Sequence, residues 1–224
     1  MKSTDPGPPR ARRHPPAGDR RFVVGVTGGL GAGKSTLVDC CVRRGAAAVS
    51  ADAVGHQVLG DPAVRAELVA AFGPGVLAAD GAVDREQLGR LAFVRPESAR
   101  TLNAISHPRL LRRLAETLEE VAAEGFEGLV VLEAALLVEW DLGGWCDLVV
   151  CVVARPETRA ARAADARGWT LEEARRRIER QLPDETRVRY ADRVLENRGT
   201  YEEFRRHADA LAGELVELAR RRLR

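Results

Sequence analysis

Hydrophobic residues in this chain gather in short continuous runs, separated by turn residues and by stretches of helical pattern. The runs cover 22–26, 46–49, 129–132, 148–153 and, more weakly, 194–195. A strand of a parallel sheet with helices on both faces is buried on both sides, so it is apolar throughout instead of alternating. The pattern therefore predicts βαβ units and an α/β fold with a parallel sheet of about five strands.

Two helix starts are marked by capping boxes, Thr170-Leu-Glu-Glu173 and Thr200-Tyr-Glu-Glu203. In such a box the Thr hydroxyl and the Glu carboxylate satisfy each other's free backbone N–H groups. The helix after the second box is predicted to pack one apolar stripe against the sheet. The residues of this stripe recur at spacings of four and three: Phe204, Ala208, Leu211, Leu215 and Leu218.

The stretch between the second and third apolar runs, about 53–127, is long and mostly helical in pattern, and an inserted substrate-binding element would fit there. Residues 1–20, rich in Pro and Arg, are predicted to be a disordered tail. This tail lacks the apolar segment of a secretory signal peptide. No run of about 18 apolar residues offers a membrane span.

The composition fits one main domain, because 224 residues with 45% hydrophobic content can bury one substantial core and a smaller inserted unit. The 35 basic and 33 acidic residues nearly cancel, so the net charge of +2 predicts neither a nucleic acid nor a membrane surface as partner. The cysteines lack C-x-x-C spacing and clustered histidines, which disfavours a zinc site and a disulfide framework and favours a reduced cytoplasm. They are Cys40, Cys41, Cys146 and Cys151.

The segment from Gly28 to Ser35 matches the phosphate-loop (P-loop) pattern G-x-x-x-x-G-K-[ST] and directly follows the first apolar run. A chain that leaves a buried strand here must turn sharply and bring its backbone N–H groups against phosphate oxygens. Four glycines remove side chains that would obstruct this approach and permit positive φ. They are Gly28, Gly29, Gly31 and Gly33.

A helix is expected to begin near Lys34 and to direct its free N–H groups at the same anion. Lys34 is expected to reach the β- and γ-phosphates of ATP, and Ser35 to supply a hydroxyl to Mg²⁺. A glycine-rich turn without a ligand is the structural alternative. The predicted nucleotide-binding residues of the loop are Gly28, Gly29, Gly31, Ala32, Gly33, Lys34, Ser35 and Thr36.

The loop alone does not separate a kinase from a switch GTPase or a mechanical ATPase. GTPases of that class usually carry an N-K-x-D motif, and neither Lys2 nor Lys34, the only lysines, follows an Asn. The GTPase class is therefore disfavoured. Glu133 ends the third apolar run, which fits either a Walker-B acid or an ordinary residue at a strand end.

Asp52 ends the second apolar segment, at the same carboxyl edge of the predicted sheet as the loop. A carboxylate there can accept a proton from a substrate hydroxyl that faces the γ-phosphate. The structural alternative is an N-cap for a helix over 53–59.

Beyond the loop, an ordered series of segments covering nearly all of 22–215 resembles the dephospho-coenzyme A kinase family. The series consists of SADAVGHQV (50–58), DGAVDREQLGRLAF (80–93), LNAISHP (102–108), LLVE (136–139), RPETRAAR (155–162), RRIERQ (176–181) and ADRVLENRG (191–199).

The resemblance implies a P-loop kinase domain over 21–224 with three α/β/α layers, a helical coenzyme-A-binding insertion near 80–125 and a lid near 162–180. The reaction it implies is phosphorylation of the ribose 3′-hydroxyl of dephospho-coenzyme A by Mg²⁺-ATP. The small-molecule acceptor is then the expected partner. The sequence carries no signal for oligomeric state.

The resemblance also implies roles for single residues. Lys34, Asp52 and Arg162 match catalytic positions, Arg162 being the lid arginine that meets the transferring phosphate. The structural alternative for Arg162 is an arginine on a solvated helix face. Asn103 and His107 match an insertion motif that lines the substrate side, and Asn197 and Gly199 match the segment near the adenine of ATP. Their structural alternatives are a helix-end residue before Pro108 and a plain β-to-α turn.

Three positions depart from the family pattern: Ser50 replaces the first aspartate of D-A-D, Glu133-Ala-Ala135 replaces D-x-P, and Ala166 replaces a second lid arginine. Arg167, one residue further on, can substitute for that arginine. The departures keep two other functions open. One is a related P-loop kinase that acts on another adenosine-like hydroxyl, and the other is a nucleotide-binding protein without catalysis.

Overall fold

The computed structural model describes residues 19–92 and 94–224, which form two compact units. The first unit combines the chain up to Ser50 with Val121–Arg224, and the second is Ala51–Glu120. Residues 1–18 of the predicted tail lie outside the described residues. Each unit is described by itself below.

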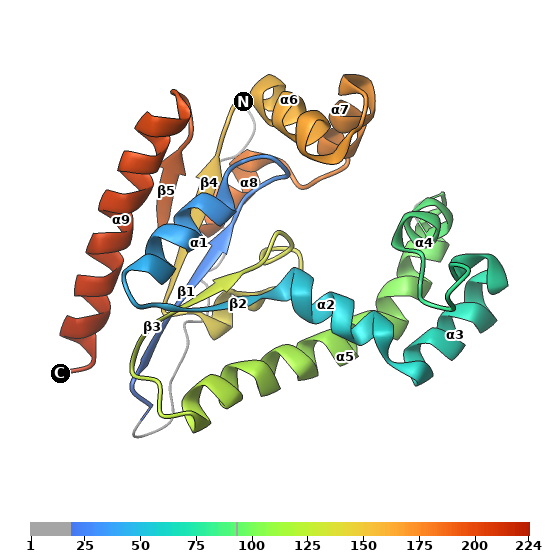
Figure 1. The fold of residues 1–224 in the computed structure, drawn as a ribbon, viewed down its shortest axis with the longest axis horizontal. Helices are drawn as coiled ribbons and strands as arrows, with labels where there is room; N and C mark the ends of the chain where they lie inside the picture. The colour runs from blue at the N-terminus through green and yellow to red at the C-terminus, as the bar shows by residue number, and fades with distance from the viewer. Residues whose placement is uncertain (1–18, 93) are drawn as a thin grey trace, which may run out of the picture. The chain divides into compact units, whose positions relative to one another are not determined.

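A five-stranded sheet in the order β2-β3-β1-β4-β5 forms the centre of the first unit (Figure 1). All neighbouring strands pair in parallel, and each predicted apolar run is one of these strands, which confirms the α/β fold class. Because β1 is the middle strand, the loop that follows it leaves from the centre of the sheet's carboxyl edge. The strands are β1 (Arg21–Thr27), β2 (Ala47–Ser50), β3 (Gly128–Glu133), β4 (Leu148–Val153) and β5 (Arg193–Glu196).

Both faces of the sheet are covered within this unit, which explains the continuous apolar runs. Helices α1 (Lys34–Arg43) and α9 (Tyr201–Arg222) lie side by side on one face, where they share a hydrophobic core with Val24 and Val26 of β1 (Figure 1). On the other face a Cβ on Gly25 would lie 2.6 Å from Leu137, in the segment after β3. Helix α8 (Asp184–Tyr190) and the short helix η2 (Leu142–Trp145) lie near the sheet as well.

The two predicted capping boxes have different outcomes. At the start of α9, Thr200 accepts from the N–H of Glu203 while the Glu203 carboxylate accepts from the N–H of Thr200, which confirms the box. The same N–H holds the pKa of Glu203 below its usual value. At the start of α7 (Leu171–Glu179), Thr170 accepts from the N–H of Glu173, but the Glu173 carboxylate accepts from Arg177.

The predicted stripe of α9 packs against the sheet as expected. Phe204, Ala208 and Leu215 are buried in the core, and Leu211 and Leu218 are partly buried against it.

Helix α6 (Pro156–Arg167) packs against α7 through a small cluster made of Ala160, Ala163 and Ala174. Trp169, in the turn between the two helices, packs on this cluster. It also makes a cation–π contact with Arg177, whose Cζ lies 4.0 Å from the centroid of the ring. The segment predicted to be a lid, 162–180, thus contains the second half of α6, this turn and all of α7. The lid function stays a prediction.

The second unit is helical, as the pattern of 53–127 predicts. A 3-10 helix, η1 (Pro74–Val76), lies between its second and third helices in chain order. The predicted coenzyme-A-binding insertion, 80–125, covers α4 and α5, whereas the compact unit begins earlier, at Ala51. The helices are α2 (Ala51–Gly60), α3 (Pro62–Phe72), α4 (Arg85–Ala92) and α5 (Pro96–Ala123), the last of which extends past the unit's boundary.

None of the helices in residues 19–92 and 94–224 combines the length and the apolar character needed to cross a lipid bilayer. All four cysteines are buried and carry free thiols.

Candidate active site

The loop between β1 and α1 has the backbone that the motif predicts. Gly31 and Gly33 adopt φ of 73° and 105°, in the left-handed region that favours glycine. Helix α1 begins at Lys34, as expected, and the backbone N–H groups of a helix's first turn have no acceptor within the helix. The loop therefore delivers backbone donors and the positive end of a helix dipole to one place.

Side chains hold the loop by its carbonyl oxygens at alternate residues. Lys34 donates from Nζ to the carbonyl of Gly28 at 3.0 Å. Arg159 donates from Nε to the carbonyl of Leu30 at 3.0 Å, and Asn197 donates from Nδ2 to that of Ala32 at 2.9 Å. Three carbonyl groups of the loop are thereby engaged by protein side chains.

Asn197 connects the loop to Arg162. Its side chain is only 3% exposed, and its Oδ1 accepts from Nη2 of Arg162 at 3.2 Å while its Nδ2 holds Ala32. Its own N–H donates to the carbonyl of Val153 at the end of β4. Asn197 therefore lies beside the loop with its side chain occupied by protein groups, and its predicted place near the adenine of ATP stays a prediction.

The second terminal nitrogen of the Arg162 guanidinium, Nη1, differs from Nη2 in its hydrogen bonding. Nη1 is buried and has no hydrogen-bond partner in the described part of the chain. A buried N–H group without an acceptor is costly, and such groups in native structures usually meet an ion, a water or a ligand. An anionic oxygen of a bound nucleotide would satisfy it.

Gly199 is placed by the cap of α9. A Cβ at this position would lie 2.3 Å from Oε2 of Glu203, the carboxylate of the capping box. The predicted role of Gly199 beside adenine is not tested by this contact.

Oxygen ligands suited to Mg²⁺ lie at the same edge of the sheet. Ser35 is exposed in the first turn of α1, and Glu133, the last residue of β3, is in register with Ser50 of β2 and Val26 of β1. Hydroxyl and carboxylate oxygens are ligands that Mg²⁺ prefers. In residues 19–92 and 94–224 no group of three or more His, Cys, Asp or Glu side chains is arranged to hold a metal ion.

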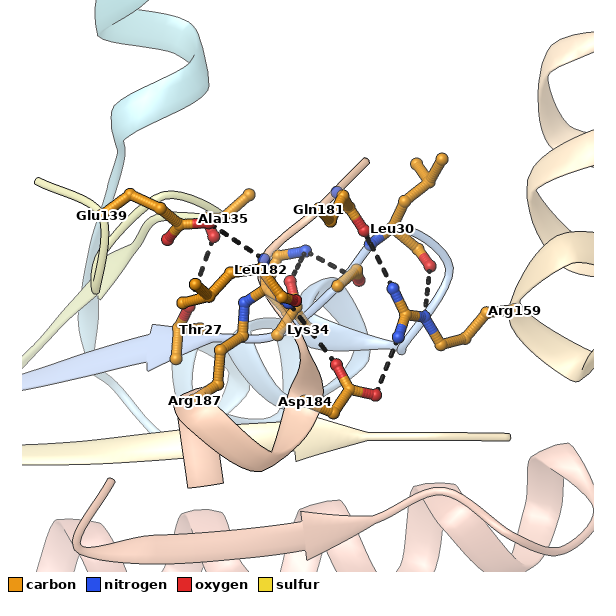
Figure 2. A network of polar contacts seen from close by, with 12 residues as sticks. Thr27, Leu30, Lys34, Ala135, Glu139, Arg159, Gln181, Leu182, Asp184 and Arg187 are labelled. Carbon is orange, nitrogen blue, oxygen red and sulfur yellow. Dashed lines mark hydrogen bonds and ion pairs between the residues drawn. The ribbon is translucent and has the colours of Figure 1, made fainter. Parts of the chain in front are cut away.

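Sequence reasoning missed a set of charged residues beneath the loop, shown in Figure 2. Arg159, only 3% exposed, donates from Nη1 to Asp184 at 2.7 Å and from Nη2 to Gln181 at 2.9 Å. Arg187, fully buried, donates to Glu139 at 3.1 Å, to Asp184 at 3.5 Å and to the carbonyl of Leu182.

One signal in the sequence pointed to Arg159. It directly precedes Ala160 and lies four residues before Ala163, so it shares the buried face of α6 with these small residues. An arginine within an apolar helix face is either paired or functional.

Cys151 lies on β4 near these charges, and burial raises the pKa of its thiol to about 12, with the Asp184 carboxylate adding to the rise. The thiol is therefore neutral at physiological pH and is not a nucleophile.

The three residues predicted on the acceptor side lie in the second unit. Asp52 is exposed in the first turn of α2, which begins at Ala51. The interpretation of Asp52 as the N-cap of a helix over 53–59 is therefore wrong, because the helix starts before it. Asn103 and His107 lie four residues apart on α5 and thus on one face of that helix, the first exposed and the second half-buried.

Comparison with known proteins decides the family. The family model described as dephospho-CoA kinase matches residues 22–203. The chain belongs to the dephospho-CoA kinase family. The match includes the loop, Asp52, Arg162 and Asn197, and membership of this family gives the chain dephospho-CoA kinase activity.

Individual relatives agree with this assignment. A dephospho-CoA kinase of Corynebacterium glutamicum is 40% identical over 195 residues, which cover 86% of this chain and 96% of that protein. One from Leifsonia xyli is 41% identical over 191 residues, covering 84% and 96%.

Two solved structures support the fold. A Thermus thermophilus crystal structure has a TM-score of 0.72 and 32% identity, covering 88% of this chain and 99% of its own. The dephospho-CoA kinase of Campylobacter jejuni has a TM-score of 0.59 and 23% identity, covering 89% and 100%, and shares the fold.

Lys34→Ala is expected to weaken ATP binding and to lower turnover, because it removes the ammonium group that lies against the loop and is expected to meet the β- and γ-phosphates. Calorimetric ATP affinity and turnover at saturating ATP are the measurements. Near-normal turnover at saturating ATP would show that the loop is not the catalytic phosphate site.

Proposed function

We propose that this chain transfers the γ-phosphoryl group of ATP to the ribose 3′-hydroxyl of dephospho-coenzyme A, with the ATP phosphates on the loop Gly28–Ser35. The observation that carries the proposal is the connection from the loop through Asn197 to Arg162, whose Nη1 is buried without a partner among the described residues. This arrangement puts a guanidinium donor beside the predicted phosphate site.

In this proposal the loop amides and Lys34 hold the β- and γ-phosphates, and Arg162 neutralises charge that develops on the transferring group. Mg²⁺ would be held by Ser35 together with phosphate oxygens, and it would supply further charge neutralisation. Residues 80–125 would bind the acceptor, with Asn103 and His107 on its side, and the lid 162–180 would close over the phosphates. Asn197 would fix Arg162 and the loop near the adenine side.

Asp52 is proposed as the general base. It lies two residues beyond Ser50, the end of β2, and β2 ends at the same carboxyl edge of the sheet from which the loop leaves β1. A carboxylate on an acceptor hydroxyl can take its proton as the phosphoryl group is transferred.

Two of the departures from the family pattern, Ser50 and Glu133, lie next to each other at the edge of the sheet. Glu133 is the register partner of Ser50 on the adjacent strand, so a carboxylate remains at this part of the sheet edge. We infer that Glu133, in place of the family's aspartate, keeps one carboxylate at this part of the edge, while Ser50 leaves it with one negative charge fewer than the family pattern.

ADP release measured with and without dephospho-coenzyme A tests the acceptor. Release that depends on dephospho-coenzyme A is expected. Release only with other adenosine-containing alcohols would identify the related kinase, and no release with any of them, despite ATP binding, would identify a protein that binds nucleotide without catalysis.

Arg162→Ala is expected to lower turnover much more than it weakens acceptor binding, because the contact strengthens as transfer proceeds. Turnover and the binding constants of both substrates should be measured. Arg155→Ala is the matched control, since Arg155 is exposed at the start of the same helix. A weaker acceptor affinity with unchanged turnover would make Arg162 a substrate clamp.

Asp52→Asn is expected to cut turnover by roughly 10²- to 10⁴-fold, the usual range for loss of a general base. ATP affinity should be preserved. Stability should fall by less than about 1 kcal/mol, because only a charge in the first turn of α2 is lost. Turnover, ATP affinity and melting temperature are the measurements.

Asp61→Asn is the control for Asp52→Asn, since Asp61 caps α3 and Asn caps a helix equally well. A normally melting Asp52→Asn protein with a near-normal rate would end the general-base assignment.

A further inference from the structure

Leu30, in the middle of the phosphate loop, is held at three points by the segment that contains the lid. Its N–H donates to Oε1 of Gln181 at 2.9 Å, and its carbonyl accepts from Nε of Arg159 at 3.0 Å. Its side chain packs on the small cluster of α6 and α7. Gln181 follows the end of α7 by two residues. Loop and lid therefore meet at one residue of the loop.

The guanidinium of Arg159 occupies the space that Gly29 leaves empty. A Cβ at Gly29 would lie 1.8 Å from Nη2 and 2.3 Å from Cζ of Arg159. Gly29 is not among the glycines with positive φ, so its backbone conformation is open to alanine. The expectation of a positive φ is therefore wrong for Gly29, and the absence of a side chain here leaves room for the arginine.

The guanidinium has little freedom to move aside. All three of its nitrogens donate, to Leu30, Asp184 and Gln181, and the residue is 3% exposed. Behind it, Asp184 also accepts from Arg187, which is paired with Glu139 in turn. The alternating charges neutralise one another, which makes burial of two arginines tolerable.

Arg159 also lies three residues before Arg162 on α6, about one turn of the helix. The same helix is thus tied to the loop twice, by Arg159 at Leu30 and by Arg162 through Asn197 at Ala32. Because the hydrogen bond from Arg159 to Leu30 fixes α6 against the loop, it restricts the positions open to the guanidinium of Arg162.

We propose that Arg159 is a positioning residue that preorganises the phosphate loop for ATP and sets the position of Arg162, and that Gly29 is glycine to admit its guanidinium. A glycine-rich loop loses much conformational entropy on ordering, and a clamp already in place in the free protein removes that cost from nucleotide binding. The proposal rests on the proposed function, in which this loop binds the phosphates of ATP.

A double-mutant cycle of Gly29→Ala and Arg159→Ala tests the proposal. Each single variant is expected to raise the KM for ATP by about tenfold, which corresponds to about 1.4 kcal/mol. The double variant should resemble Arg159→Ala alone within about twofold, because the added methyl group then has no guanidinium to displace. The KM for dephospho-coenzyme A should change by less than about twofold in all three.

The split between the two KM values separates positioning from general damage, since partial unfolding lowers the active fraction without changing either KM. Melting temperatures are recorded for every variant. Controls are Arg155→Ala, which removes an exposed arginine of the same helix, and Gly213→Ala, where a Cβ meets only ordinary contacts at 3.6 Å and beyond. Both should keep the wild-type KM for ATP.

Independent effects of Gly29→Ala and Arg159→Ala, whose fold-changes multiply in the double variant, would overturn the proposal. If Arg159→Ala does not fold, Gln181→Ala decides, since it removes the acceptor of both Leu30 N–H and Arg159 Nη2 without unpairing a charge. A raised KM for ATP then supports the proposal and an unchanged one overturns it. A different result would refute the proposed function itself: a Lys34→Ala variant whose ATP turnover equals that of the wild type.

Discussion

A loop that binds phosphate through its backbone N–H groups has few side chains with which to hold its own shape. In this protein three side chains hold the loop by its carbonyl groups. Lys34 donates to the carbonyl of Gly28, Arg159 to that of Leu30 and Asn197 to that of Ala32. These carbonyl groups are thereby fixed, and the first turn of α1 keeps N–H groups that have no acceptor within the helix. The rest of the first unit places these three side chains.

Each support comes from a different part of the chain. Lys34 belongs to the helix that follows the loop, Arg159 to α6 after β4, and Asn197 to the turn after β5. The parallel sheet makes this convergence necessary, because the carboxyl ends of β1, β4 and β5 lie at one edge. The same geometry puts Glu133 of β3 next to Ser50 of β2, which explains how the edge keeps a carboxylate despite the change at Ser50.

The buried charges under the loop contact both the loop and the segment after α7. The side chains of Arg159 and Arg187 are 4% and 0% exposed, whereas those of their partners Asp184 and Glu139 are 22% and 25% exposed. Solvent therefore screens these ion pairs less than it screens fully exposed ones. Arg159 has the additional property of contacting the loop and the segment after α7 at once, through Leu30 and Gln181. The hydrogen bonds of Arg159 to Asp184 and Gln181 stabilise the buried charges, and its hydrogen bond to Leu30 orders the loop, so one side chain serves both.

The sequence by itself determined the five strands, the loop conformation at Gly31 and Gly33, and the start of α9, because these follow from local hydrophobic pattern, glycine chemistry and capping. It also carried the family, through motifs in a fixed order. It misjudged the start of α2 by two residues, since helix ends differ little in energy from one residue to the next and Asp52 suits both a cap and a first turn.

Only the tertiary structure decided which of many arginines are buried beneath the loop. Arg159 meets the carbonyl of Leu30 across 129 positions of sequence, and Asn197 meets that of Ala32 across 165. No local pattern reports such pairs, because the burial of a charged side chain depends on acceptors that come from distant segments. For the same reason the need for glycine at Gly29 became visible only when the guanidinium beside it was in place.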